Sequence, residues 1–194
     1  MSESTEVIQE ILQPLGLEAN YRNAALTMLE EGESKYLRDF KLNFNSILTS
    51  DHLSPKEVAL MGLCIAVNNI NGPLTQFFKQ RAANEGATAE EISESVSVAS
   101  LLSANNVLYR FRHFTQKEAY QKMGAKMRMQ IMMKPVTGKP FFELMSLAVS
   151  AVNGCEQCVN SHEDSLIKLD IKEEKIWDAV RIATVVTATG KVIY

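Results

Sequence analysis

Apolar residues recur at helical spacing along most of the chain, and two long segments begin with strong helix start signals. In "SPKEVALMGLCIAV", Ser54 is the expected N-cap, Pro55 takes the first helical position and Glu57 completes a capping box. In "TAEEISESVSVASLLSANNVLYRF", Thr88 and Glu91 form the same arrangement. Both segments are therefore predicted to be helices.

The rest of the chain follows the same pattern. Further helices are expected over about 141–152 and through "EEKIWDAVRIATVV". In the helix that follows Thr88, the spacing places Ile92, Val96 and Ala99 on one apolar face. The alternation of apolar and polar residues that is typical of strands occurs only in fragments. The predicted fold class is all-α.

The chain also resembles itself. An offset of 84 residues aligns 59–110 with 143–194 without a gap, and most identities fall on apolar helix positions. We therefore predict an internally duplicated helical domain over residues 51–194, built from these two repeats. Residues 1–50 are predicted to form a helical extension that packs on this core.

Composition narrows the classes of partner. The chain has 194 residues, of which 46% are hydrophobic and 22% charged, as is ordinary for a globular protein. Its net charge of −3 comes without a basic stripe, so nucleic acid is not an expected partner. The start "MSESTEVIQE" lacks the pattern of a secretory signal, and no apolar run reaches the roughly 20 residues that cross a bilayer. The expected location is the cytoplasm, without membrane association.

Candidate chemistry is concentrated in "CEQCVNSH". Cys155, Cys158 and His162 are spaced by three and four residues, so they share one face of a predicted helix. The Asn-Gly pair at 153–154 is a turn signal between two helical patterns. If the chain reverses there, Glu143 lies beside His162, although 19 residues of one straight helix would separate them by nearly 30 Å.

This arrangement favours redox chemistry. Cysteines in the first turn of a helix are stabilised as thiolates by exposed N–H groups, and an imidazole oriented by a carboxylate can exchange the thiol proton. The same residues could bind zinc, with Cys155, Cys158, His162 and Glu143 as ligands. We favour redox chemistry because a CxxC pair without a second CxxC or a distant histidine pair is weak metal evidence. Two buried thiols and a structural histidine form the remaining alternative.

The spacing of Glu143, Cys155, Cys158 and His162 resembles the alkylhydroperoxidase D family, within the carboxymuconolactone decarboxylase-like superfamily. The resemblance covers about 36–190 and includes "YLRDFKLNFNSI", "NNVLYRFRHF" and "FELMSLAVSAVNGCEQCVNSHE". It implies an all-helical, duplicated subunit that assembles as a homotrimer or a hexamer, with peroxidase activity toward hydroperoxides. Some superfamily members lack thiol chemistry and use the fold for decarboxylation, but retention of these four residues argues against that role here.

The resemblance also implies residue roles. Cys158 would react with the peroxide, Cys155 would donate a proton and resolve the sulfenic acid as a disulfide, and Glu143 and His162 would relay protons. Some members carry a histidine where this chain has Gln157, which can hydrogen-bond but cannot titrate. No bound cofactor is expected. Dihydrolipoamide or another dithiol would be the reductant, a lipoylated dehydrogenase subunit and a peroxiredoxin the partners, and a redox sensor or zinc module without turnover the alternative.

Other conspicuous residues are interpreted more simply. Cys64 aligns with an apolar helix position of the other repeat and is expected in the core. The Met-rich run "KMGAKMRMQIMMK" is expected to pack within the subunit or the oligomer rather than to form a partner surface. Tyr36 and Trp177 are expected in the core. No role beyond an interface or a solvated cluster is predicted for Arg110, Arg112 and His113.

Overall fold

The computed structural model describes residues 2–194, and within that range it contains α-helices, one 3₁₀ turn and no strand. This confirms the all-α prediction. None of the helices in the described part combines the length and the apolar character needed to span a bilayer. The elements in chain order are α1 (Glu3–Leu12), α2 (Ala24–Glu31), α3 (Tyr36–Ser46), α4 (Pro55–Asn68), α5 (Gly72–Asn84), α6 (Ala89–Thr115), α7 (Glu118–Lys122), the 3₁₀ turn η1 (Gln130–Met132), α8 (Lys139–Val152), α9 (Glu156–Lys168) and α10 (Glu173–Thr189).

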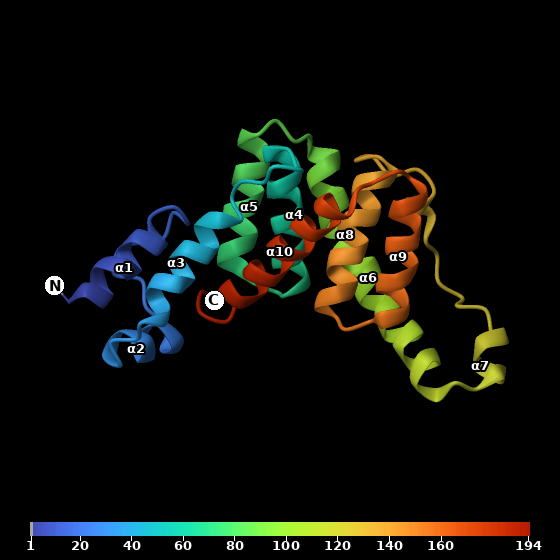
Figure 1. Cartoon of the computed structure of the whole chain (residues 1–194), viewed down its shortest axis with the longest axis horizontal. Coiled ribbons are helices and arrows are strands. Elements are labelled where there is room, and N and C mark those ends of the chain that lie inside the picture. Colours follow the sequence, from blue (N-terminus) through green and yellow to red (C-terminus); the bar gives the residue numbers. More distant parts are fainter. Residues whose placement is uncertain (1) are drawn as a thin grey trace.

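Helix boundaries repeat along the chain at the offset found in the sequence. The pair α4 and α5 becomes the pair α8 and α9 when 84 is added to each first and last residue, and α10 begins 84 residues after α6. Both pairs are hairpins of closely packed helices, seen in Figure 1 in green and orange. The two repeats thus build the same supersecondary unit. The sequence boundary near residue 50 stays a prediction.

The two predicted capping boxes start α4 and α6. The Ser54 side chain accepts from the backbone N–H of Glu57, and the Glu57 carboxylate accepts from the backbone N–H of Ser54. Thr88 and Glu91 make the same reciprocal pair. Each box satisfies two backbone donors that the helix itself leaves unpaired. Local sequence alone therefore sets these helix starts.

The core lies where α4 and α8 cross the middle of the molecule, packed by α6 and α10. Nine consecutive residues of α4, from Val58 to Ala66, are buried, and so are ten of α8, from Phe141 to Ser150. Helices that are apolar on all sides fit this central position. Gly62 allows α5 to pack closely on α4, because a Cβ atom at this position would overlap the ring of Phe78.

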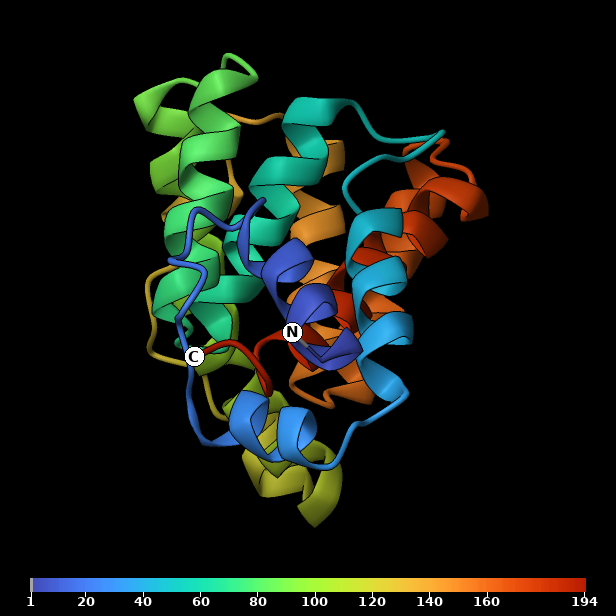
Figure 2. The same cartoon turned by 90° about the vertical axis from the view of Figure 1, so that its left-hand side faces the viewer.

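The N-terminal helices α1, α2 and α3 form one end of the molecule, coloured blue in Figures 1 and 2. α3 packs against α10, and α1 packs against α3. The chain's C-terminal residues also hold this end, because Tyr21 Oη donates to the carbonyl of Tyr194 at 2.5 Å and Asn23 Nδ2 donates to that of Val192 at 2.9 Å. The packing of α3 on α10 and the hydrogen bonds to the C-terminal residues thus attach the N-terminal helices to the rest of the molecule.

At the opposite end, the second half of α6 extends beyond the helical body and leads to α7 (Figure 1). The chain returns along residues 123–138 to the start of α8. Glu94, which is buried, anchors the end of this return segment by accepting from the backbone N–H groups of Val136 at 2.6 Å and Thr137 at 2.8 Å. A carboxylate on α6 thereby determines where α8 begins.

Three core predictions are wrong. Tyr36 and Trp177 are 42% and 66% exposed, and Val96 is 41% exposed. Tyr36 opens α3 at the edge of the N-terminal helices, and Trp177 lies on the side of α10 opposite its buried stripe. Val96 falls outside the face of α6 that packs inward, which uses Ser95, Val98 and Ala99 instead.

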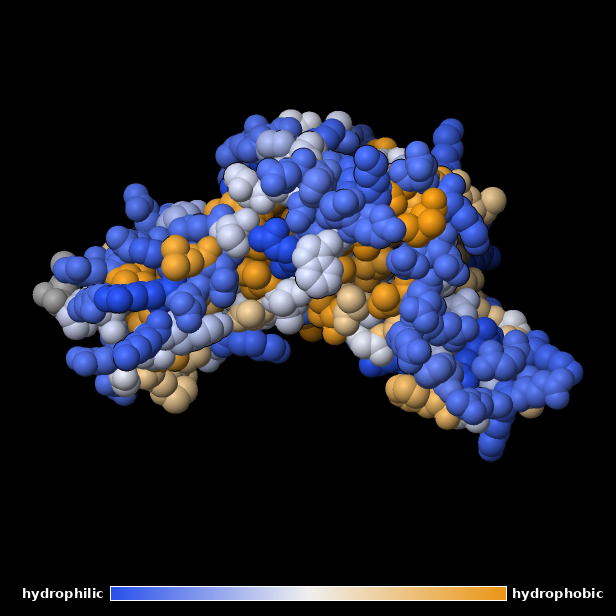
Figure 3. Space-filling model, viewed as in Figure 1, coloured by the Kyte–Doolittle hydropathy of each residue, from blue (hydrophilic) through white to orange (hydrophobic). Residues whose placement is uncertain are grey.

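Figure 3 shows apolar surface gathered in the middle of one face, between the two ends of the molecule.

Candidate functional site

The hairpin of α8 and α9 brings together residues that lie 19 positions apart in the sequence. α8 ends at Val152, Gly154 takes a positive φ of 68° in the turn, and α9 begins at Glu156. Across this hairpin, His162 Nδ1 lies 2.5 Å from Glu143 Oε2. The predicted proximity of Glu143 and His162 is confirmed.

Glu143 is a buried carboxylate that contacts two side chains, His162 and Lys139. Its side chain is 4% exposed, and Lys139, one helical turn earlier, places Nζ 2.5 Å from Oε1. Burial raises the pKa of this carboxyl, but the hydrogen bonds from His162 and Lys139 outweigh burial and leave the pKa below its ordinary value. Glu143 is therefore an anion at neutral pH. Because an ionised carboxylate only accepts, it fixes the proton of His162 on Nδ1 and leaves Nε2 as a base.

Cys155 and Cys158 are joined by a disulfide, with their Cα atoms 5.3 Å apart, so the structure represents the oxidised form. Cys155 occupies the N-cap position of α9 and is fully buried, whereas Cys158 lies one turn into the helix and is 6% exposed. Cys158 is thus the more exposed residue of the pair. Both lie at the positive end of the helix, which stabilises a thiolate once the bond is reduced.

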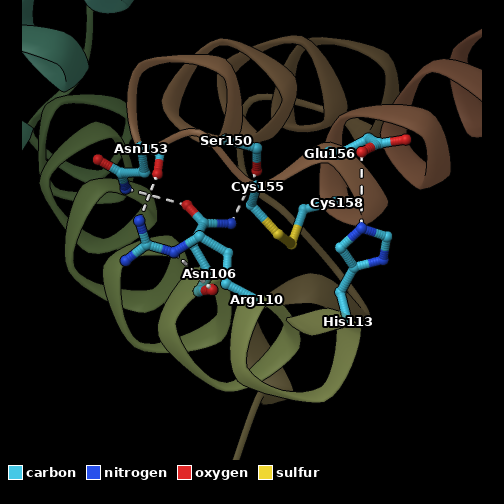
Figure 4. Close-up of a disulfide and its surroundings, with 8 residues drawn as sticks. All are labelled: Asn106, Arg110, His113, Ser150, Asn153, Cys155, Glu156 and Cys158. Carbon is cyan, nitrogen blue, oxygen red and sulfur yellow. Dashed lines mark hydrogen bonds and ion pairs between the residues drawn. A yellow bond between two sulfur atoms is a disulfide. The ribbon is translucent and has the colours of Figure 1, made fainter. Parts of the chain in front are cut away.

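Side chains from α6 hold the turn that precedes Cys155, as Figure 4 shows. Arg110 donates from Nη1 to the carbonyl of Asn153 at 2.8 Å, and Asn106 Oδ1 accepts from Asn153 Nδ2 at 2.9 Å. Asn106 Nδ2 also donates to Ser150 Oγ at 3.0 Å. The sequence indicated no role for Arg110 beyond an interface. Its contacts make it a support of the turn.

Beside the disulfide lies a cavity of about 200 Å³. Cys158 and His162 both line it, together with Gln157 and Ser161 from α9, Leu102, Asn105 and Tyr109 from α6, and Met129 and Met132 from the return segment. Cys158 and His162 therefore border one small, partly apolar space. A reacting molecule that entered it would meet both groups.

Gln157 separates this cavity from a second, more open hollow of about 480 Å³. The second hollow is lined by polar residues, among them His113, whose Nε2 lies 3.6 Å from Glu156 Oε2 (Figure 4). Gln157, which stands where some family members have a histidine, thus lines both spaces, and its role in the reaction stays a prediction. His113 lies at its rim rather than in an isolated charged cluster.

Several residues at the site were not predicted from the sequence. Lys139 carried a signal, because it precedes Glu143 by one helical turn. Asn105 and Tyr109 fall in the segment "NNVLYRFRHF", and the two methionines fall in the Met-rich run, but neither segment indicated a place at the site, which these residues reach through tertiary packing. The Met-rich run was expected to pack within the subunit or the oligomer. In the single chain Met129 and Met132 line the cavity, whereas Met123 and Met133 are 59% and 85% exposed, so packing of these two in an oligomer stays a prediction.

Cys64 is the third cysteine of the chain and lies on α4. It is fully buried in the core as predicted, and burial raises the pKa of its thiol well above the ordinary range.

The zinc alternative needs four ligands around one point. Among residues 2–194, no three His, Cys, Asp or Glu side chains converge in this way, and the two candidate thiolates are bonded to each other.

Fold and site together define an all-helical, duplicated protein with a CxxC pair next to a buried histidine–glutamate pair. The carboxymuconolactone decarboxylase family matches over residues 118–194. Alkyl hydroperoxide reductase AhpD of Anaeromyxobacter dehalogenans strain 2CP-C is 38% identical over 167 residues, which cover 86% of this chain and 89% of the relative. AhpD of Coxiella burnetii strain RSA 493 is 35% identical over 81% of this chain and 90% of its own length, and AhpD of Beijerinckia indica is 34% identical over 86% and 92%. The chain belongs to the alkyl hydroperoxide reductase AhpD family.

Proposed function

We propose that this protein is a thiol-dependent peroxidase that reduces hydroperoxides through the Cys155–Cys158 dithiol. The observation that carries this proposal is the shared cavity of Cys158 and His162, with His162 held by an ionised Glu143. The names of the relatives, alkyl hydroperoxide reductase, support the same reaction class. Each step of the reaction uses residues described above.

In the reduced protein, His162 Nε2 takes the proton of the Cys158 thiol, and Glu143 stabilises the resulting imidazolium. The Cys158 thiolate attacks the terminal oxygen of the hydroperoxide and breaks the O–O bond. The leaving alkoxide receives the proton from His162. The products are a sulfenic acid on Cys158 and one molecule of alcohol, and His162 returns to its neutral form.

Cys155 then resolves the sulfenic acid. Its thiol sulfur attacks the Cys158 sulfur, the S–O bond breaks, and the hydroxyl leaves as water with the Cys155 proton. The product is the disulfide seen in the structure. Since Cys155 is buried at the N-cap of α9, it is positioned for this internal attack and shielded from external peroxide.

A dithiol reductant closes the cycle. Dihydrolipoamide attacks Cys158, which is the more exposed residue of the pair, and a second thiol of the same reductant releases the reduced pair as a cyclic disulfide forms. A lipoylated dehydrogenase subunit is the proposed macromolecular source of this group. A peroxiredoxin whose disulfide accepts electrons from the Cys155–Cys158 dithiol is the proposed second partner.

Several copies of the chain form the proposed working unit, a homotrimer or a hexamer. The single chain exposes 10607 Å², whereas a compact monomer of 21.6 kDa would expose about 9,200 Å². Part of this surface is apolar, including Phe114 at 74% and Ile70 at 93% exposure. Association of copies would cover such surface.

The proposal is tested by following tert-butyl hydroperoxide consumption by the purified protein with dihydrolipoamide. We expect turnover in the wild type, none in Cys158→Ser, and wild-type rates in Cys64→Ala, which removes the thiol that lies in the core. Absence of turnover, together with stoichiometric zinc and cysteines that resist alkylation until it is chelated, would show a binding module instead.

A further inference from the structure

One polar atom in the cavity beside Cys158 is unpaired. Asn105 is 4% exposed and lines the cavity, and its Oδ1 has no hydrogen-bond partner among the described residues. The other end of the amide is engaged weakly, because Nδ2 donates to Met129 Sδ at 3.4 Å. Buried carbonyl oxygens are almost always paired, since leaving one unpaired costs free energy. Asn105 is a lining residue of the cavity, so the cavity is a space from which a donor could approach this oxygen.

The chemistry of the cavity defines what that donor can be. Cys158 and His162 line the same cavity as Asn105, but from α9 rather than from α6. A hydroperoxide carries a single O–H group, and this group belongs to the terminal oxygen that a thiolate attacks. An acceptor on a different helix from the thiolate can bind the O–H of that oxygen while the thiolate attacks it.

We propose that Asn105 orients the hydroperoxide by accepting a hydrogen bond from its terminal O–H through Oδ1. The inference rests on the proposed peroxidase function and adds a substrate-contacting residue from a different helix. Three groups then define the reaction path: Asn105 holds the terminal oxygen, Cys158 attacks it, and His162 protonates the departing alkoxide. No electrons or protons beyond those of the peroxidase reaction are required.

Two variants of similar side-chain size test whether Asn105 acts as a hydrogen-bond acceptor or only through packing. Asn105→Leu removes the acceptor oxygen, whereas Asn105→Asp keeps one at the same reach. Each reduced protein is mixed with tert-butyl hydroperoxide in single turnover, and separately with a small aromatic disulfide. Both reactions need the Cys158 thiolate, so the ratio of the two rates cancels any change in its population. Asn84→Leu, an exposed asparagine at the end of α5, is the matched control.

We expect the ratio of peroxide rate to disulfide rate to fall about tenfold in Asn105→Leu, as loss of one transition-state hydrogen bond predicts. It should stay within about threefold of wild type in Asn105→Asp and be unchanged in Asn84→Leu. An unchanged ratio in Asn105→Leu overturns the role of Asn105 while leaving the peroxidase proposal intact. A wild type that reacts with the disulfide but not with the peroxide overturns the proposed function and this inference with it.

Discussion

At the scale of single residues, the site depends on one buried carboxylate that remains ionised. Glu143 opposes its own desolvation with bonds to His162 and Lys139, one on each oxygen. The hydrogen bond to Glu143 holds the His162 proton on Nδ1 and leaves Nε2 as the basic nitrogen. The contact with Lys139 helps to keep the Glu143 carboxyl ionised, so that it can go on accepting this hydrogen bond. In the proposed reaction, Glu143 acts on Cys158 through His162.

The lowered pKa of Glu143 predicts how stability depends on pH. A carboxyl whose pKa is lower in the folded state contributes stability above its unfolded pKa, near 4.5, and loses it as pH falls through the folded value. We expect the free energy of unfolding to drop below pH 4.5, and Glu143→Gln to remove part of this drop.

Urea unfolding of the oxidised protein between pH 3 and 7 measures the effect. Asp164→Asn, an exposed carboxylate on the same helix as His162, should keep the wild-type profile. A Glu143→Gln variant with the same acid dependence as the wild type would contradict the account.

The pairing of Glu143 with His162 could be predicted from the sequence because a turn signal and two helical patterns define a hairpin, and a hairpin determines which residues face each other. Asn105 could not be predicted in this way. It lies on α6, and its approach to Cys158 depends on how α6 crosses the hairpin. Sequence spacing carries no information about that crossing.

At the scale of elements, α6 supports the turn between α8 and α9 through Arg110 and Asn106. The first repeat shows what the hairpin requires for packing alone, because Ala59 and Phe78 stand where Glu143 and His162 stand in the second. The helices therefore form without the reactive residues. The second hairpin carries chemistry on a scaffold that packing already stabilises.

Arg110→Ala should destabilise the protein by about 2 kcal/mol, because it removes a charged donor from the carbonyl of Asn153 at a partly buried position. Chemical denaturation of the oxidised form measures the loss. Arg38→Ala, which removes an exposed ion pair with Glu3, should cost less than about 1 kcal/mol. Equal losses in the two variants would show that Arg110 does not support the turn.

The helix starts were predicted correctly, whereas the burial of some side chains was not, because a helix start depends on local sequence and burial does not. A capping box is a local structure, so Ser54 and Thr88 identify their helices without reference to the rest of the chain. Burial is a property of the whole fold. Trp177 is apolar enough for a core, yet α10 packs through Ile176, Ala179 and Ile182 and leaves it outside.

At the scale of the whole molecule, the elongated subunit and its exposed apolar surface predict an oligomer (Figure 3). Analytical ultracentrifugation should give a mass three or six times the 21.6 kDa of one chain. A charge placed at the exposed end of α6, Phe114→Glu, should shift the distribution toward single chains if this end takes part in the association. A wild-type mass of 21.6 kDa at micromolar concentration would contradict the assembly proposed here.

The central claim is that Cys158 is the sulfur that reacts with peroxide and Cys155 the sulfur that resolves it. Cys155→Ser, reduced and treated with one equivalent of tert-butyl hydroperoxide, isolates the first step, and mass spectrometry of trapped peptides locates the product. The account predicts a sulfenic acid on Cys158 of Cys155→Ser and none on Cys155 of Cys158→Ser. A sulfenic acid on Cys155, or on neither residue, would contradict it.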